Sequence, residues 1–511
     1  MATHAALGIL NDGGNAFDAA VAAASTLFVT WPMSCGIGGD AVFVGYDRYR
    51  NHPIGVTALG AAPAAASTDL FRSLGHTAIP SRGALSATVP VALRSIAALH
   101  ARHCSLPLQT LLAPAIRAAA DGFAVNRQFH LWTQSNIRHI RTDAWLATTF
   151  APAGRAWPVG TWLRQPETAA VLEMFAARGQ AYLTDPNFVH PLVDTSRSRG
   201  GLFTAEDFAD VPDPDASLLS GPLADAHLFT SPLPTQGYLL LQNCGIYGRS
   251  SGGCGQPRSH RIHLLCEAFN QTFAQRLEAL GDPAFLGELR WLVDPDNIDR
   301  LANRIRLDGK TPCLYRDWYS EGDTTQFVVA DEHGNIVSAI LSLSLGFGAG
   351  IADAKTGMIF NNRLGRSATL NPMHPNVVQP RKRPVNTIHA YLVMRNGQAL
   401  LAGGSPGGDG QAQWNSDLLT SILLEEIPVT DAVPQARFTY FPGADLFEAE
   451  REDALHIERP TQALSDGLTE LGYRVVPLAK VKGCLRVIAR LGNGWIGVDD
   501  GHEDGLTASL H

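Results

Sequence analysis

The sequence predicts an α+β protein in which a mainly helical first part and a strand-rich second part share one core. Helical spacing of apolar residues dominates up to about residue 320, and short strands joined by polar turns dominate after it. Hydrophobic residues make up 45% of the 511 residues and charged residues 17%, a balance typical of a large folded core. Neither part has the pattern of a free-standing domain, so we expect a single folded body.

The helices are predicted from Ala-rich composition and from apolar residues at helical spacing. They span residues 5–10, 16–29, 91–120 with a break near Leu106-Pro107, 165–178 and 261–280. Gly13-Gly14 ends the first helix and lets the second begin afresh. Residues 195–260 are rich in Gly, Pro, Ser and Asp, so loops and short strands are expected there.

The strands are predicted from short apolar runs bounded by turn residues. They span residues 41–46, 326–330, 336–344, 388–394, 398–402, 473–476, 485–489 and 495–498. The turn at 331–335 joins two of these strands, and Arg395-Asn396-Gly397 joins the next two, so two β-hairpins are expected.

Charge, hydropathy and cysteine content exclude several classes of function. The formal net charge of -8 and the pI near 6.1 disfavour binding to phosphate backbones, so we expect no nucleic-acid partner. No apolar run reaches the ~18 residues of a membrane span and no signal peptide is visible, so we expect a soluble, cytoplasmic protein with no membrane partner. The seven cysteines form no CxxC pair, which excludes a disulfide scaffold and argues against a zinc knuckle.

Two segments carry the residue types of a nucleophile and of an oxyanion site. Thr324 opens a predicted strand directly after Gly322-Asp323, a place where a threonine is by itself commonly structural. The segment 403–410 has five glycines in eight residues after an apolar strand, so its backbone N–H groups can converge on an oxyanion or a phosphate. It lacks both the ending of a P-loop and the spacing of a dinucleotide-binding loop.

Together with the segments 15–21 and 36–39, these motifs resemble the γ-glutamyltransferase family of N-terminal-nucleophile hydrolases. The similarity follows the order of the family across nearly the whole chain. Further matching segments are 86–90, 165–167, 232–237, 267–269, 281–283, 346–351, Asn361-Asn362, 382–384 and the Gly407-Gly408 loop. The motifs are closest to those of the oxamate-amidohydrolase-like branch, through Asn362-Arg363, His374-Pro375-Asn376 and 407–411.

The resemblance implies a four-layer αββα sandwich and no metal or organic cofactor. Members cut their own chain before a nucleophilic threonine, here at the Asp323–Thr324 bond. The segments 1–323 and 324–511 would then remain together as a heterodimer, which can pair into a dimer of heterodimers. A hydroxyl is a poor nucleophile near neutral pH, and the α-amino group freed by cleavage, with a pKa of about 7.7–8.0, is a base beside it.

The resemblance also assigns roles to residues around the nucleophile. Ser342 corresponds to a second hydroxyl that supports the nucleophile. Gly407 and Gly408 correspond to the backbone N–H donors that stabilise the oxyanion. Asn386 and Thr387 fall where members of the family contact the carboxylate of the substrate.

Two departures from the family pattern bear on the substrate. Glutamyl-specific members hold the substrate α-carboxylate with an arginine shortly before an Ala-Pro pair, but residues 57–63 contain no arginine. They hold the α-ammonium with an acidic residue a few positions after the paired Asn, where this chain has Arg363 and Arg366. Arginines disfavour an ammonium and can grip a carboxylate with two nitrogens, so both are predicted to bind substrate.

The sequence therefore predicts an autoprocessing hydrolase that cleaves an amide-type bond of a small anionic metabolite through an acyl-Thr324 intermediate. Three alternatives stay open. They are a C–C bond hydrolase of a keto acid in an antibiotic or other specialised pathway, a γ-glutamyl transferase or hydrolase, and an inactive relative acting as a scaffold. Retention of Thr324, Ser342 and the glycine loop together argues against the scaffold.

Overall fold

The computed structural model describes residues 1–314, 323–440, 453–503 and 505–510. Its helices are α1 Ala2–Asn11, α2 Ala16–Thr30, α3 Thr68–Ser73, α4 Ala92–His103, α5 Leu108–Ala120, α6 Arg127–Ser135, α7 Ile137–Ile140, α8 Ala144–Phe150, α9 Pro166–Arg178, α10 Pro186–Ser198, α11 Ala205–Ala209, α12 Tyr238–Ser250, α13 Arg258–Ala279, α14 Pro283–Leu286, α15 Pro295–Ala302, α16 Arg363–Ser367, α17 Gly410–Leu423, α18 Val429–Ala432 and α19 Gln462–Glu470. Its strands are β1 Asp40–Asp47, β2 His52–Ala58, β3 Phe123–Ala124, β4 Trp162–Leu163, β5 Leu219–Leu223, β6 Ala226–Thr230, β7 Asp323–Ala330, β8 Ile336–Ser344, β9 Tyr391–Arg395, β10 Gln398–Gly404, β11 Phe438–Tyr440, β12 Leu455–Glu458, β13 Val475–Leu478, β14 Arg486–Leu491 and β15 Gly494–Asp499. In these ranges, no helix combines the length and the apolar character needed to cross a membrane.

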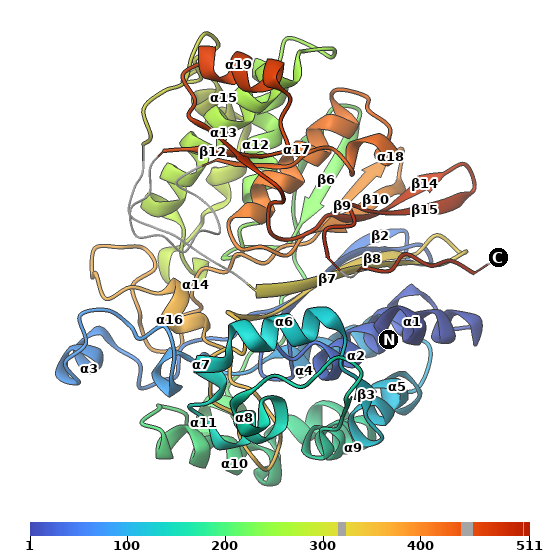
Figure 1. Ribbon diagram of the computed structural model, residues 1–511, viewed down its shortest axis with the longest axis vertical. Helices are drawn as coiled ribbons and strands as arrows, with labels where there is room; N and C mark the ends of the chain where they lie inside the picture. Colours follow the sequence, from blue (N-terminus) through green and yellow to red (C-terminus); the bar gives the residue numbers. More distant parts are fainter. Residues whose placement is uncertain (315–322, 441–452, 504, 511) are drawn as a thin grey trace.

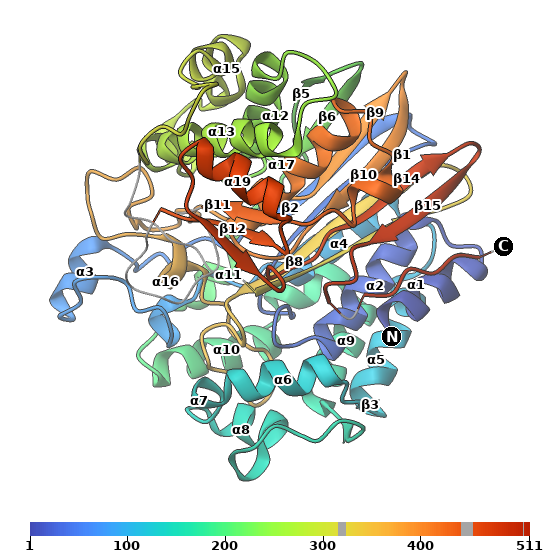
Figure 2. The same cartoon turned by 45° about the horizontal axis from the view of Figure 1, so that its top comes forward.

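Two antiparallel sheets face each other between two layers of helices (Figure 1 and Figure 2). The first sheet has the strand order β2-β1-β8-β7, and the second has the order β15-β14-β10-β9-β6-β5. Helices α2, α4 and α5 lie on the outer face of the first sheet, and α12, α13 and α17 lie on the outer face of the second. The predicted four-layer αββα sandwich is confirmed.

Alternation of side chains along the strands separates the apolar cores. Ala41 and Phe43 belong to the core beneath the first helical layer, whereas Val42 and Val44 belong to the core between the two sheets. A third core lies between the second sheet and α12, α13 and α17. Because these strands bury both faces, they read in the sequence as continuous apolar runs rather than as alternating patterns.

Both large sheets combine strands from before and after Thr324. In the first sheet β1 pairs with β8, and in the second β6 pairs with β9. The division into segments 1–323 and 324–511, predicted from the resemblance, thus crosses both sheets and does not separate two domains. The expectation of one shared core agrees with this arrangement.

Most of the predicted elements are confirmed, and one prediction is wrong in part. The predicted helices correspond to α1, α2, α4, α5, α9 and α13, and the two predicted hairpins are β7–β8 and β9–β10. Residues 195–260 were expected to hold only loops and short strands, but α12 lies there. Its residues are buried on nearly all sides, so no polar face reveals the helical period. Gly245, which lowers helix propensity, lies where an added Cβ would meet Ile298 at 3.0 Å.

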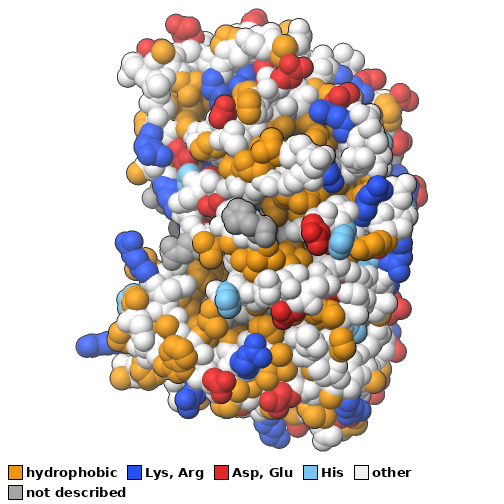
Figure 3. Space-filling view, turned by 90° about the vertical axis from the view of Figure 1, so that its right-hand side faces the viewer, with side chains coloured by type: hydrophobic (Ala, Val, Ile, Leu, Met, Phe, Trp, Pro, Cys, Tyr) orange, Lys and Arg blue, Asp and Glu red, His pale blue; other side chains and the backbone are white. Residues whose placement is uncertain are grey.

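β7 is an edge strand of the first sheet, and an apolar cavity of about 220 Å³ lies along it. Leu10, Leu27 and Trp31 contribute to its lining, and β14 and β15 close it from the second sheet. Figure 3 shows apolar side chains gathered on this side of the molecule, which also carries the end of the chain. The lining includes Thr325 but neither Thr324 nor Ser342, so the cavity is separate from the site described below.

The close approach of β1 and β8 at Gly45 can be tested by adding one methyl group. A Cβ at this position would lie 2.4 Å from the carbonyl oxygen of Ile336, so we expect Gly45→Ala to lower the free energy of unfolding by ~1–3 kcal/mol. Gly8→Ala is the matched control, because no atom lies within 4 Å of its added Cβ in α1, and it should stabilise the protein by ~0.5–1 kcal/mol. Urea unfolding followed by circular dichroism measures both, and a Gly45→Ala protein as stable as the wild type would contradict the close approach.

Candidate active site

Thr324 lies near the start of β7, and its Oγ1 atom is 3.3 Å from the Oγ atom of Ser342 on the neighbouring strand β8. Both side chains are buried, with 5% and 1% of their surface exposed. Ser342 shares a strand face with Ile340, which belongs to the core between the sheets. The backbone of Asp323 pairs with Ser344, and Gly322 lies outside the described residues. The structure thus brings the predicted nucleophile and the predicted supporting hydroxyl together at the inner face of the first sheet.

Besides the Thr324 hydroxyl, which donates to it, two further donors hold the hydroxyl oxygen of Ser342. The N–H group of Ser344 donates to it at 2.9 Å, and Nη2 of Arg363 donates at 3.2 Å. Ser344 has a φ of 87°, a left-handed conformation that residues other than glycine rarely adopt. Such strain persists only where the surroundings impose it, and it concentrates at functional sites. The Oγ atom of Ser344 is buried and has no hydrogen-bond partner among the described residues.

Arg363 opens α16 and forms a buried ion pair with Asp40, the first residue of β1. Its Nε donates to Oδ2 of Asp40 at 3.1 Å, and its Nη1 has no partner in the described part of the chain. Asp40 also accepts hydrogen bonds from the N–H of Gly60 and from Nδ2 of Asn386, both at 2.8 Å. Burial raises the pKa of Asp40, and the neighbouring guanidinium opposes this rise. A carboxylate and a guanidinium that cancel in charge therefore lie directly behind Ser342.

This arrangement changes what Arg363 can offer a substrate. The sequence predicts that two guanidinium nitrogens of Arg363 bind a substrate carboxylate. Two of its three nitrogens, however, already bind Asp40 and Ser342. Only Nη1 remains, so a two-nitrogen grip does not fit the arrangement. Arg366 lies one turn further along α16, where its Nη1 donates to the carbonyl of Ser344 at 3.5 Å. Both predicted arginines therefore lie at the end of β8.

Asn386 and Thr387 precede β9 and differ in what they can contact. The side chain of Asn386 donates to Asp40 and accepts from the N–H of Ile388, and its backbone bonds to the segment 234–236. Every polar group of Asn386 is thus bound within the protein. The hydroxyl of Thr387 is buried and has no partner among the residues that the structure describes. Of the two predicted carboxylate contacts, Thr387 is the one whose side chain is available to a ligand.

Gly407 and Gly408 form a loop between β10 and α17, with φ angles of 125° and 53° that favour glycine. Their carbonyls accept hydrogen bonds from the first turn of α17, whereas neither of their own N–H groups donates to another described residue. Two such N–H groups in one loop can bind an oxyanion. The loop begins beside the first sheet, because an added Cβ on Gly404 would lie 2.9 Å from Ile340.

A buried ion pair supports the glycine loop. Asp409, which directly follows Gly408, accepts hydrogen bonds from Nη1 of Arg276 at 2.6 Å and from Nε2 of Gln236 at 3.1 Å. Arg276 lies on α13 with its side chain fully buried, and its guanidinium lies 4.4 Å from the ring centre of Phe273. The pair therefore anchors the loop to a helix that precedes the expected cleavage site.

Sequence reasoning missed Asp40, Arg276 and Asp409 as parts of the site. Asp40 carries a usable signal, because a charged residue at the start of a wholly apolar strand needs a buried partner. Asp409 also stands out, because it is an acid between two glycines. No local pattern distinguishes Arg276 from the other polar residues of its helix.

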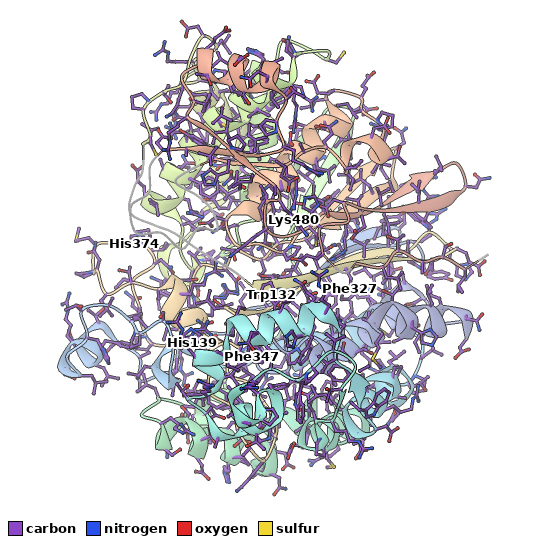
Figure 4. The ribbon with its side chains drawn as sticks, viewed as in Figure 1. Trp132, His139, Phe327, Phe347, His374 and Lys480 are labelled. Carbon is purple, nitrogen blue, oxygen red and sulfur yellow. The ribbon has the colours of Figure 1, made fainter. Side chains whose placement is uncertain are left out.

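The nearby histidines and Cys35 have structural surroundings. Burial lowers the pKa of His389 to about 4, so its imidazole is neutral near pH 7, and its Nδ1 atom lies 3.0 Å from the carbonyl of Thr387. His374 lies on the loop after α16, away from β7, which Phe327 marks in Figure 4. Burial raises the pKa of the Cys35 thiol well above its usual value, which suits a packed side chain. These surroundings give none of the three a part in the chemistry around Thr324.

The two facing antiparallel sheets between helical layers are the fold of N-terminal-nucleophile hydrolases, and this chain is a hydrolase of that type. The family model described as gamma-glutamyltranspeptidase matches residues 2–510, and the chain belongs to that family.

Named relatives agree with this assignment. The chain is 30% identical to the oxamate amidohydrolase proenzyme of Klebsiella pneumoniae, with 99% of this chain and 96% of the relative covered. It is 29% identical to the glutathione hydrolase-like YwrD proenzyme of Bacillus subtilis, with 91% and 88% covered. Among solved structures, the cephalosporin acylase from Bacillus halodurans superposes with a TM-score of 0.90 at 25% identity and covers 100% of this chain and 94% of its own.

The support of the glycine loop can be tested by breaking and then neutralising its ion pair. Arg276→Met should lower the free energy of unfolding by ~3–5 kcal/mol, because it leaves the buried carboxylate of Asp409 without its cation. The double variant Arg276→Met/Asp409→Asn removes both charges and should recover a large part of this loss. Urea unfolding of the three proteins measures the recovery. A double variant less stable than Arg276→Met would show that the two side chains do not act as a pair.

Proposed function

We propose that the chain cuts itself at the Asp323–Thr324 bond and then hydrolyses an amide-type bond of a small anionic metabolite through Thr324. The observation that carries this proposal is the 3.3 Å approach of the Thr324 and Ser342 hydroxyls at the start of β7. The N–H groups of Gly407 and Gly408, which donate to no other described residue, and the proenzyme names of two relatives add support.

Self-cleavage in this proposal is an N→O acyl shift. Oγ1 of Thr324 attacks the carbonyl carbon of Asp323, the C–N bond breaks, and the nitrogen takes up the hydroxyl proton to become a free amine. The ester between Asp323 and Oγ1 is then hydrolysed by water. The products are a carboxylate at residue 323 and a new N-terminus at Thr324, whose α-amino group has a pKa of about 7.7–8.0 and can serve as a base.

Substrate hydrolysis repeats the same chemistry on an external carbonyl. The α-amino group takes the hydroxyl proton as Oγ1 bonds to the carbonyl carbon, and the negative charge that forms on the carbonyl oxygen is stabilised by the N–H groups of Gly407 and Gly408. The C–N bond then breaks and the leaving amine takes the proton from the α-ammonium. Water, activated by the same amine, releases the acid from Thr324.

The proposed substrate is small and anionic because of the donors that surround Thr324. Nη1 of Arg363 and the hydroxyls of Ser344 and Thr387 are buried and unbound within the described residues. Each can donate a hydrogen bond to a carboxylate. Asp40 and Asp409, the two acids that the described residues bring to the site, are each already paired with an arginine and so are not free to hold an ammonium. The name of the oxamate amidohydrolase relative describes an amide of this kind.

The same site could also attack the ketone of a keto acid, in which case a C–C bond breaks. That reaction needs a substrate whose own conjugation accepts the electron pair of the leaving carbon, and the residues around Thr324 do not distinguish it from amide hydrolysis. The family membership keeps γ-glutamyl transfer as another alternative. Of the two predictions that follow, the first separates a processed hydrolase from an inert scaffold, and the second separates the amide hydrolase from a γ-glutamyl transferase.

Processing is the first prediction. The purified protein should contain two tightly associated pieces, residues 1–323 and 324–511, and Thr324→Ala should remain one chain because no hydroxyl is left to accept the acyl group. The pieces should separate only in denaturant, since β1 and β8 are paired across the cut. Intact-mass measurement and N-terminal sequencing test this. A wild-type chain that stays uncut would favour the inert scaffold, and a new N-terminus elsewhere would remove Thr324 from its role.

Substrate charge is the second prediction. We compare γ-glutamyl-p-nitroanilide with glutaryl-p-nitroanilide, which lacks the ammonium and keeps a carboxylate. The matured enzyme should release nitroaniline from the glutaryl compound with a kcat/KM roughly tenfold higher or more, because an ammonium that gives up water beside these hydrogen-bond donors without an unpaired acid costs on the order of 1–2 kcal/mol. Equal or faster turnover of the γ-glutamyl compound would restore the γ-glutamyl transferase alternative.

A further inference from the structure

Asp40 comes from the segment before Thr324 and contacts the residues around Ser342. It opens β1, its Cα pairs with that of Ser342 across the two strands, and only 1% of its surface is exposed. The strands approach closely there, because an added Cβ on Gly39 would lie 2.4 Å from the carbonyl oxygen of Ser342. The position of this carboxylate is therefore tied to the backbone that carries the supporting hydroxyl.

The oxygens of Asp40 are held by donors from three separate parts of the chain. Oδ1 accepts the N–H of Gly60, and Oδ2 accepts both Nε of Arg363 and Nδ2 of Asn386. Asn386 in turn is fixed by the Ile388 N–H and by backbone bonds. The carboxylate can neither rotate nor shift without breaking several of these bonds.

Because the guanidinium of Arg363 is rigid, the fixed position of the Asp40 carboxylate also fixes the contact between Arg363 and Ser342. Nε, Nη1 and Nη2 of Arg363 lie in one plane, so a contact that holds Nε also decides where the other two nitrogens lie. Nη2 is then placed 3.2 Å from Oγ of Ser342, and Nη1 is left as a cationic donor without a partner among the described residues. Ser342 Oγ is 3.3 Å from the nucleophile, so Asp40 reaches Thr324 through two intermediates.

We propose that Asp40 is a positioning residue for catalysis: through Arg363 it holds the Ser342 hydroxyl against Thr324 and cancels the guanidinium charge beside the catalytic amine. The inference rests on the proposed function and adds to it a residue that acts without touching the substrate. It also assigns Arg363 two roles, because the nitrogen that supports Ser342 and the nitrogen left for a substrate belong to the same side chain.

The central experiment is Asp40→Asn, which keeps the size of the side chain and removes its charge. In the matured enzyme, kcat for glutaryl-p-nitroanilide should fall by roughly ten- to a thousandfold, the range for one displaced hydrogen bond near the reacting atoms. Self-cleavage of the precursor should slow as well, since it uses the same hydroxyl. Asp47→Asn is the matched control, because Asp47 ends the same strand about 23 Å away and should leave both rates unchanged.

The pH profile separates positioning from a merely structural role. In Asp40→Asn the charge of Arg363 is no longer cancelled, so the pKa of the Thr324 amine should fall and the acid limb of kcat/KM should move to lower pH by roughly 0.5–1.5 units. Among the described side chains, the other charged groups near this end of β7 include Arg366 on α16 and Arg486 on β14, which lies close to Asp499 and Glu503. The Asp40→Asn substitution leaves these side chains in place, so the shift of the acid limb reports on the charge of Arg363.

The double variant Asp40→Asn/Arg363→Gln removes both charges and keeps the interior neutral, so it should fold even if Asp40→Asn alone does not. Its acid limb should return to the wild-type position, and its kcat should be no lower than that of Arg363→Gln, because Asp40 acts through Arg363. If the losses of the two single variants multiply in the double variant, or if Asp40→Asn keeps the wild-type kcat and pH profile, the inference is wrong. A wild-type protein that neither cuts itself nor turns over any substrate would instead overturn the proposed function, and the two failures are therefore distinguishable.

Discussion

The pairing of β8 between β1 and β7 is the constraint on which the site depends. Through it Asp40, Ser342 and Thr324 lie on three adjacent strands, with the Cα of Asp40 opposite that of Ser342 and the backbone of Asp323 paired with Ser344. Both faces of β8 are buried along its whole length. A slip of one residue would turn Ser342 from the inner face of the sheet toward the helices and would bury apolar side chains on the wrong side. The register that protects the core thus also fixes the distances in the site.

Buried ion pairs make a second connection between the parts of the chain before and after Thr324. Asp40 pairs with Arg363 and Arg276 with Asp409, both fully buried, and the buried Asp282 pairs with the partly exposed Arg383. Burying a charge pair costs about as much in desolvation as the attraction returns, so such pairs contribute little net stability. Their effect is to raise the free energy of other ways of packing the two segments, because a different packing would leave one charge of a pair buried without its partner. Each of these pairs also joins residues on opposite sides of the Asp323–Thr324 bond, so the arrangement does not depend on that bond.

The parts of the site that could be predicted from the sequence are those that a local pattern defines. Thr324 at the start of a hairpin and five glycines after a strand are visible in a few residues, and the order of family motifs then predicts the sandwich. The partners of Arg363 could not be predicted in this way, because Asp40 is more than 300 residues distant and becomes a neighbour only through the β1–β8 pairing. The buried helix α12 was missed for a related reason, since a helix that is buried on nearly all sides shows no apolar period to detect. Residues whose role follows from their sequence neighbours could be predicted, whereas contacts between residues far apart in the sequence could not.

The cancellation of charge between Asp40 and Arg363 resolves a conflict between binding an anion and keeping a base. A cluster of uncompensated cations would attract a carboxylate strongly, but it would also lower the pKa of the Thr324 amine and weaken it as a base. An unpaired acid would have the opposite effect on the amine and would repel the substrate. In the proposed mechanism, a neutral pair places no uncompensated cation beside the α-amino group of Thr324, so the amine keeps its strength as a base. Recognition of the anion then rests on directional donors, namely Nη1 of Arg363 and the hydroxyls of Ser344 and Thr387, and not on net charge. Donors of this number suit a single carboxylate, so in the proposed function the ion pair that holds Ser342 in place also favours a small monoanionic amide.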